Sequence, residues 1–129
     1  MPVSPARPDY VAHQRAVRAA FSQVAGDLRE ILGAKLSAYL GGVKETRAVN
    51  EWADGTREPG AETQRRLRLA LQVAIAIADA DGPDVARAWF AGLNPQLEDR
   101  SPARLLREGD LDEVGPAVIA AERAFLIGG

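Results

Sequence analysis

The sequence contains no cysteine, which excludes disulfide bonds, thiol nucleophiles and zinc fingers. It has one histidine, His13, without an evident partner, so an acid–base or triad mechanism built on histidine is not expected. Phosphate-binding glycine loops are also missing, because Gly41-Gly42 and Gly128-Gly129 match neither of the common patterns. The sequence therefore predicts that the protein is not an enzyme and that it needs no cofactor and no metal.

Long hydrophobic runs are absent as well. No stretch approaches the roughly 18 to 20 apolar residues that a membrane span requires. The first ten residues, MPVSPARPDY, contain three prolines and no apolar core of a secretion signal. We therefore expect a cytoplasmic protein with no membrane contact, and a flexible arm over residues 1–9, where the prolines block regular structure.

The 129 residues fall within the range of one compact domain, and 47% of them are hydrophobic. Apolar residues recur at helical spacing, and no segment alternates as a strand would. The expected fold is all-α with six or seven helices, divided into a helical part over residues 10–80 and a second part over residues 81–129. The first helical face is expected to hold Val17, Phe21, Val24, Leu28 and Ile31.

Charge is unevenly distributed along the chain. Residues 33–78 carry seven basic and five acidic side chains, whereas residues 79–129 carry five basic and ten acidic ones. A mildly basic middle and an acidic C-terminal part are suited to different partners, although a difference of this size is also common without one.

The middle segment, AKLSAYLGGVKETRAVNEWADGTREPG at 34–60, predicts two short helices at about 34–40 and 45–53 around a Gly-Gly turn. A DNA-binding helix-turn-helix needs small and apolar residues at its structural positions. Those positions are filled here by Ala38, Gly42, Val49 and Trp52. The polar face would leave base or phosphate contacts to Lys44, Thr46, Arg47, Asn50 and Arg57. A helical hairpin with a solvated polar face remains the alternative.

Two stretches carry a family resemblance. VNEWADGTREPGAETQRRLRLAL at 49–71 resembles the end of an Xre-type helix-turn-helix, through Val49, Trp52, Gly55 and Pro59. The turn is one residue longer than in that pattern, and Ala53 replaces its usual Glu.

The second stretch, ARAWFAGLNPQLEDRSPARLLREGDLDEV at 86–114, resembles the toxin-binding domain of Xre/MbcA/ParS antitoxins. Asp99 stands where that family often has Gly. The matching residues are Trp89, Asn94, Pro95, Leu97, Ser101, Pro102, Leu105, Leu106 and Val114.

This resemblance implies an antitoxin of a type II toxin–antitoxin pair. Its partner would be a RES-domain toxin, an enzyme that consumes NAD⁺. In such antitoxins the C-terminal region obstructs the entrance to the toxin's active site, and the Xre-like part binds promoter DNA of the operon. A homodimer is also expected, since two half-sites multiply the affinity of one short recognition helix.

The last residues, ERAFLIGG, fit a probe for an apolar cleft. The candidates for toxin contact are Trp89, Arg123, Phe125, Leu126, Ile127, Gly128 and Gly129. The alternatives are that the segment is the frayed end of a core helix and that Arg123 lies on a solvated face.

The acids around 94–113 could form a metal site or a catalytic carboxylate pair. The sequence favours another explanation for them. Asp110 and Glu113 fit a helix-capping box, and interleaved arginines explain much of the rest. Asn94-Pro95 is expected to end one helix and Ser101-Pro102 to start the next. The competing hypothesis for the whole chain is a helical adaptor that binds a protein partner but not DNA, which the weak positive charge of residues 33–78 allows.

Overall fold

The computed structural model describes residues 20–128, and this part of the chain is all-α, as expected. The expected arm at 1–9, His13, Val17 and Gly129 lie outside the described residues. Within that range, no helix is long and apolar enough to cross a membrane. Seven α-helices and one 3-10 helix, η1, are described: α2 (Phe21–Leu32), α3 (Ala34–Leu40), α4 (Thr46–Asp54), α5 (Ala61–Asp81), α6 (Pro83–Ala91), η1 (Pro95–Leu97), α7 (Pro102–Glu108) and α8 (Leu111–Gly128).

The helix ends follow local rules that the sequence displays. Gly55 ends α4 in the left-handed conformation, with φ of 79° and ψ of 8°, which an L side chain rarely adopts. Pro83 and Pro102 begin α6 and α7, where a missing N–H costs nothing. The Ser101 hydroxyl accepts a hydrogen bond from the Arg104 amide at 3.1 Å, so the predicted N-cap of α7 is confirmed.

The prediction that Asn94-Pro95 ends a helix is wrong in detail. Helix α6 already ends at Ala91, and Asn94 instead caps η1 by accepting the Gln96 amide at 2.9 Å. Because a proline disfavours helical backbone in the residue before it, Asn94 is extended and the chain turns there. Asp99, which stands where the resembled family often has Gly, has φ of 61°, a value that Asp tolerates better than most residues.

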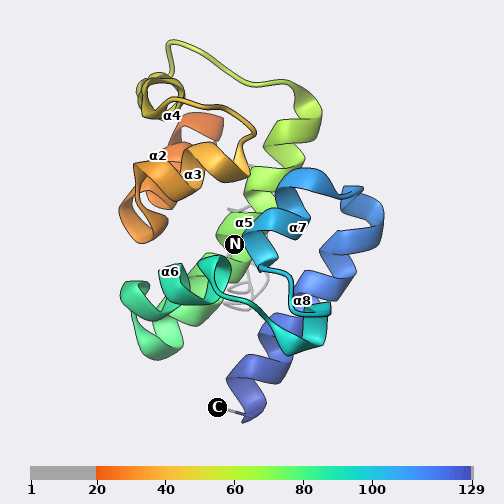
Figure 1. Ribbon diagram of the computed structural model, residues 1–129. Helices are drawn as coiled ribbons and strands as arrows, with labels where there is room; N and C mark the ends of the chain where they lie inside the picture. Colours follow the sequence, from red (N-terminus) through yellow and green to blue (C-terminus); the bar gives the residue numbers. More distant parts are fainter. Residues whose placement is uncertain (1–19, 129) are drawn as a thin grey trace, which may run out of the picture.

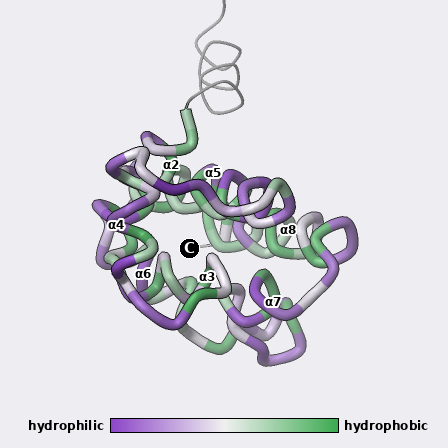
Figure 2. The backbone as a smooth tube through the Cα atoms, turned by 90° about the horizontal axis from the view of Figure 1, so that it is seen from above, coloured by the Kyte–Doolittle hydropathy of each residue, from purple (hydrophilic) through white to green (hydrophobic). Residues whose placement is uncertain are grey.

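Helix α5 is the central element of the fold. It packs against four other helices, α2, α3, α6 and α8. Figure 1 shows α2, α3 and α4 grouped together, and α7 packs against α3, α6 and α8. Seen from above, the helices surround a common interior (Figure 2).

That interior is one continuous hydrophobic cluster with contributions from both expected parts of the chain. On α2, Phe21, Val24 and Leu28 are buried as predicted, but the last core residue is Leu32, while Ile31 is only partly buried. Leu97, Leu105 and Leu106, three residues of the family resemblance, are buried and anchor the 94–110 stretch. Both parts share this core. The division of the chain into residues 10–80 and 81–129 is therefore kept only as a proposal that the two parts bind different partners.

Trp52 of α4 packs against residues of α2 and of the turn after α3, and so holds α2, α3 and α4 together. Its side chain is 2% exposed and meets the ring of Phe21 edge to face at 6.0 Å between centroids. The other side of the indole lies against Gly41, where an added Cβ would stand 2.7 Å from the Trp52 ring. A glycine at 41 is therefore required by space.

A buried carboxyl lies on α8. Glu122 is 9% exposed, and burial raises the pKa of this carboxyl above its ordinary value, with Arg123 opposing the shift. Neighbouring positions on the same helix, Val118 and Ala121, are core residues. Glu122 is thus a polar residue on the apolar face of α8.

We predict that Gly41→Ala destabilises the protein by about 1–3 kcal/mol, because the new methyl group would clash with the buried Trp52 ring. The backbone at 41 is right-handed helical, with φ of −77°, so alanine meets no backbone strain there. The control is Gly26→Ala in α2, where no atom lies within 4 Å of the added Cβ. That change should stabilise by about 0.5–1 kcal/mol. Chemical denaturation measures both, and equal effects would contradict the steric explanation.

We also predict that Glu122→Gln raises stability at neutral pH. A carboxyl whose pKa is raised on folding costs stability when it is ionised, and this cost declines as the pH falls through the folded pKa and is gone below the unfolded pKa. The difference between wild type and variant, measured by thermal unfolding across pH, should therefore shrink on acidification. A difference that grows on acidification would show that ionised Glu122 is stabilised instead.

Candidate functional site

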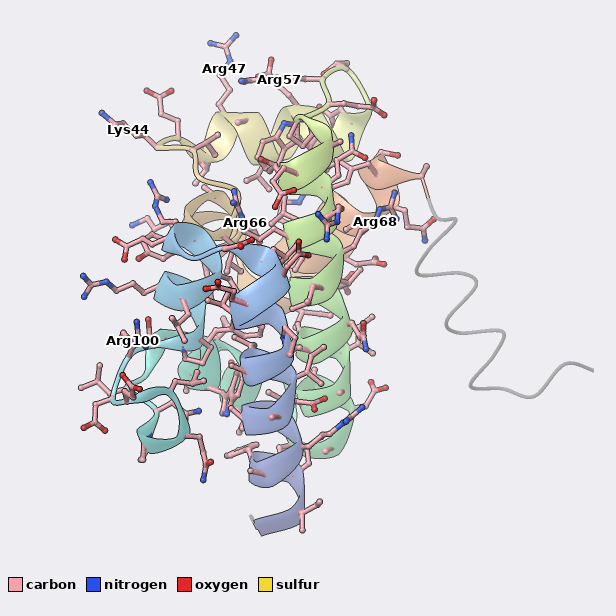
Figure 3. The ribbon with its side chains drawn as sticks, turned by 90° about the vertical axis from the view of Figure 1, so that its right-hand side faces the viewer. Lys44, Arg47, Arg57, Arg66, Arg68 and Arg100 are labelled. Atoms are coloured by element: carbon pink, nitrogen blue, oxygen red, sulfur yellow. The ribbon has the colours of Figure 1, made fainter. Side chains whose placement is uncertain are left out.

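The polar residues predicted to contact DNA gather around the start of α4. Lys44 and Arg47 are exposed, and Thr46 is the first residue of the helix and half-buried. Arg57 follows α4 and is also exposed. Figure 3 shows Lys44, Arg47 and Arg57 extending from the same end of the molecule. Together with Asn50 they are called the α4 surface below.

Glu51 modifies the charge of this surface, and the sequence reasoning did not single it out. Its carboxylate lies 3.9 Å from Arg47 Nε and 3.5 Å from Arg57 Nη1. These pairs are exposed, with 82% of the Arg47 side chain accessible, so they contribute little to stability. Their consequence is electrostatic: one carboxylate offsets part of the charge of two arginines.

Asn50 is already engaged within the protein. Its Oδ1 atom accepts a hydrogen bond from Arg29 Nη1 of α2 at 2.9 Å. A bidentate contact to adenine uses both the oxygen and the NH₂ group of the amide. Arg29 and a base would therefore share or compete for the Asn50 oxygen, a coupling that spans 21 positions in the sequence.

The structure places Trp89 in the core. Its side chain is 8% exposed and packs edge to face on Phe90 at 5.3 Å and against Phe125 at 6.4 Å between centroids. Trp89 therefore connects the end of α6 to the last turns of α8. Any role of Trp89 in binding a partner would act through the position of Phe125, which is half-buried.

The end of α8 exposes apolar surface beyond Phe125. Leu126 is 37% exposed and Ile127 is 88% exposed, and Arg123 and Gly128 are exposed as well. Leu93, at 76% exposure, was missed by the sequence reasoning; its signal is an apolar residue in the loop directly after α6. The Trp89–Phe125 contact brings the end of α6 to the end of α8, and we call the exposed residues Leu126 and Ile127 the apolar tail surface.

Several acids of the 94–113 stretch have structural partners. Glu98 pairs with Arg100 at 3.5 Å, and Glu108 pairs with Arg104 at 2.8 Å. The Asp110 carboxylate accepts the Asp112 amide at 3.2 Å, which confirms its capping role. Among the described residues, no group of three acidic, histidine or cysteine side chains is placed to hold a metal ion.

The α4 surface and the apolar tail surface lie far apart. In Figure 3 the labelled residues around α4 are at the top, whereas α8 ends at the bottom of the molecule. Two partners could thus be bound without overlap, one at each end of the long helix α5.

Comparison with known proteins gives one informative result. No family model matches the chain, and no curated protein matches it. Among solved structures, a chain of the M. tuberculosis MbcT–MbcA toxin–antitoxin complex is similar to it, with 28% sequence identity and a TM-score of 0.67. The match covers 86% of this chain and 96% of that chain. This similarity in sequence and fold supports an antitoxin role for the chain.

Proposed function

We propose that this protein is the antitoxin of a type II toxin–antitoxin pair, which binds a RES-domain, NAD⁺-consuming toxin and blocks it sterically. The observation that carries the proposal is the match over 86% of the chain to a chain of a toxin–antitoxin complex. The motif order at 86–114 that resembles Xre/MbcA/ParS antitoxins supports the choice of toxin class. Inhibition without catalysis requires only that one surface fits the partner.

The apolar tail surface is the proposed toxin contact. When a partner covers exposed leucine and isoleucine side chains, their apolar surface leaves water and the free energy of the complex is lowered. Phe125, held by Trp89, fixes the direction of the last turn, and Arg123 adds a cation on the exposed side. Gly128 and Gly129 belong to this proposed contact with the entrance of the toxin's active site.

The α4 surface is the proposed DNA contact, used to repress the operon. Its support is the placement of Lys44, Arg47 and Arg57 on one end of the molecule, next to a short helix that follows a tight turn. In a helix-turn-helix the second helix enters the major groove, and α4 occupies that place. A homodimer that spans two half-sites remains part of this proposal.

One observation favours the alternative of a protein-binding adaptor without DNA binding. Glu51 offsets Arg47 and Arg57, and Asn50 is bonded to Arg29, so much of the α4 surface is already paired internally. Operator binding depends on several phosphate contacts. The strength of DNA binding, and its dependence on Glu51, therefore separates the two functions.

We predict that Ile127→Asp weakens toxin inhibition by about tenfold or more, because a carboxylate would enter an apolar cleft unpaired. The measurement is NAD⁺ consumption by the RES-domain toxin that this proposal expects beside the gene, titrated with the antitoxin. Ile75→Asp on α5 is the matched control, since Ile75 is also an exposed isoleucine, at 38%, outside the apolar tail surface. Equal inhibition by both variants would place the interface elsewhere, and no inhibition by the wild type would refute the antitoxin proposal.

We predict that Arg47→Gln and Glu51→Gln change DNA binding in opposite directions. The first removes a phosphate contact and lowers the salt slope of log Kd by about 0.9, whereas the second frees two arginines and tightens binding. Fluorescence anisotropy with the duplex upstream of the gene, at roughly 50–200 mM salt, measures both. Absent binding at the lowest salt, together with intact toxin inhibition, would favour the adaptor.

A further inference from the structure

A second basic feature lies beside the α4 surface. A groove of about 830 Å³ runs between α3, the turn before α4, and α7. It shares Lys44 and Arg47 with the α4 surface, so the two are continuous. The groove is further lined by the charged and aromatic residues Lys35, Tyr39, Arg107 and Glu108.

Arg107 of α7 is held in a defined position on the wall of this groove. Its Nη1 donates a hydrogen bond to the Tyr39 carbonyl oxygen at 2.7 Å, and its guanidinium carbon lies 4.6 Å from the centre of the Tyr39 ring. A guanidinium stacked on an aromatic ring loses little further freedom when it binds an anion. It carries five N–H donors, so the contact with the carbonyl leaves donors for a phosphate.

The charge of Arg107 is reinforced by its neighbours. Arg66 of α5 donates to the Leu40 carbonyl at 2.7 Å, one residue from the carbonyl that Arg107 binds. Burial lowers the pKa of Arg66, Glu62 opposes this shift and the positive charge of Arg107 adds to it. Two guanidinium groups are therefore bound near the end of α3, of which Arg107 lines the groove.

The acids of the groove do not cancel this charge. Glu108 is bound to Arg104 Nε at 2.8 Å, so its carboxylate has a cation of its own. Glu45 is the second acid of the groove, whose lining contains four cations: Lys35, Lys44, Arg47 and Arg107. The cations are spread over three elements, which suits a row of phosphates better than a single small anion.

We propose that the DNA-binding surface continues from α4 across this groove onto α7, where Arg107, with Lys35 of α3, binds the phosphate backbone of the same duplex. The proposal rests on the proposed DNA binding by α4. In a helix-turn-helix the first helix crosses the backbone while the second enters the groove, and Lys35 and Tyr39 lie on the exposed side of α3. DNA contact would then involve the C-terminal part of the chain as well as the middle segment.

Salt-dependent DNA titration of the full chain tests this proposal. Phosphate contacts carry no sequence information, so Arg107→Gln should weaken binding by roughly three- to tenfold and reduce the salt slope by about 0.9, on the upstream duplex and on an unrelated duplex alike. Lys35→Gln should act in the same way. Because Lys35 is exposed and makes no contact with the carbonyl that Arg107 binds, it decides the question if Arg107→Gln fails to fold.

Two controls separate charge from position. Arg107→Lys keeps the charge and should keep most of the salt slope. Arg100→Gln removes an exposed arginine that also belongs to the C-terminal part but lies away from the α4 end (Figure 3), and should change nothing.

The outcomes are distinguishable. One outcome is that the wild type binds DNA and Arg47→Gln binds it more weakly, but Arg107→Gln and Lys35→Gln keep the full salt slope. The extension onto α7 is then refuted, while DNA binding stands. If Arg107→Gln loses toxin inhibition with unchanged DNA affinity, the groove binds an acidic protein segment instead, and the proposal is overturned. If the wild type binds no DNA, the proposed operator binding fails and this inference fails with it.

Discussion

The contact between Trp52 and Gly41 is the constraint on which the orientation of α4 depends. The indole fills the space that a side chain at 41 would occupy, and Phe21 closes its other side. Helices α2, α3 and α4 are therefore held together by one buried ring, close to the tight turn at Gly41-Gly42. Because the core around Trp52 admits few rearrangements, the polar face of α4 points outward in a single direction, and every argument about that face follows from this packing.

The end of α3 is the second point where distant parts of the chain meet. A helix leaves its final carbonyl groups without partners inside the helix, and here the Gly42 amide donates to the Tyr39 oxygen at 3.1 Å while side chains supply further donors. Arg66 from α5 and Arg107 from α7 donate to the oxygens of Leu40 and Tyr39. These two arginines satisfy the backbone, join the C-terminal part to the middle segment, and raise the local positive potential beside the α4 surface.

The charged stretch at 94–110 illustrates how far local chemistry can be predicted. Ser101 and Asp110 cap the helices that follow them, and the arginines pair with the acids two to four positions away. These interactions are within reach of the chain's own neighbours, so the sequence order alone indicates them. The position of Asn94 was predicted less well, because Gly92 ends α6 earlier and leaves Asn94 to cap η1.

The sequence by itself determined the all-α class, most helix ends, the caps and the buried leucines, because each depends on residues within one or two helical turns. It also carried the resemblance to antitoxins. Only the tertiary structure decided that Trp89 lies in the core against Phe125, that Arg29 binds Asn50, and that Leu93 is exposed. These features depend on which side chains of distant segments meet, and helical periodicity gives the face of each helix but not its neighbour across the core.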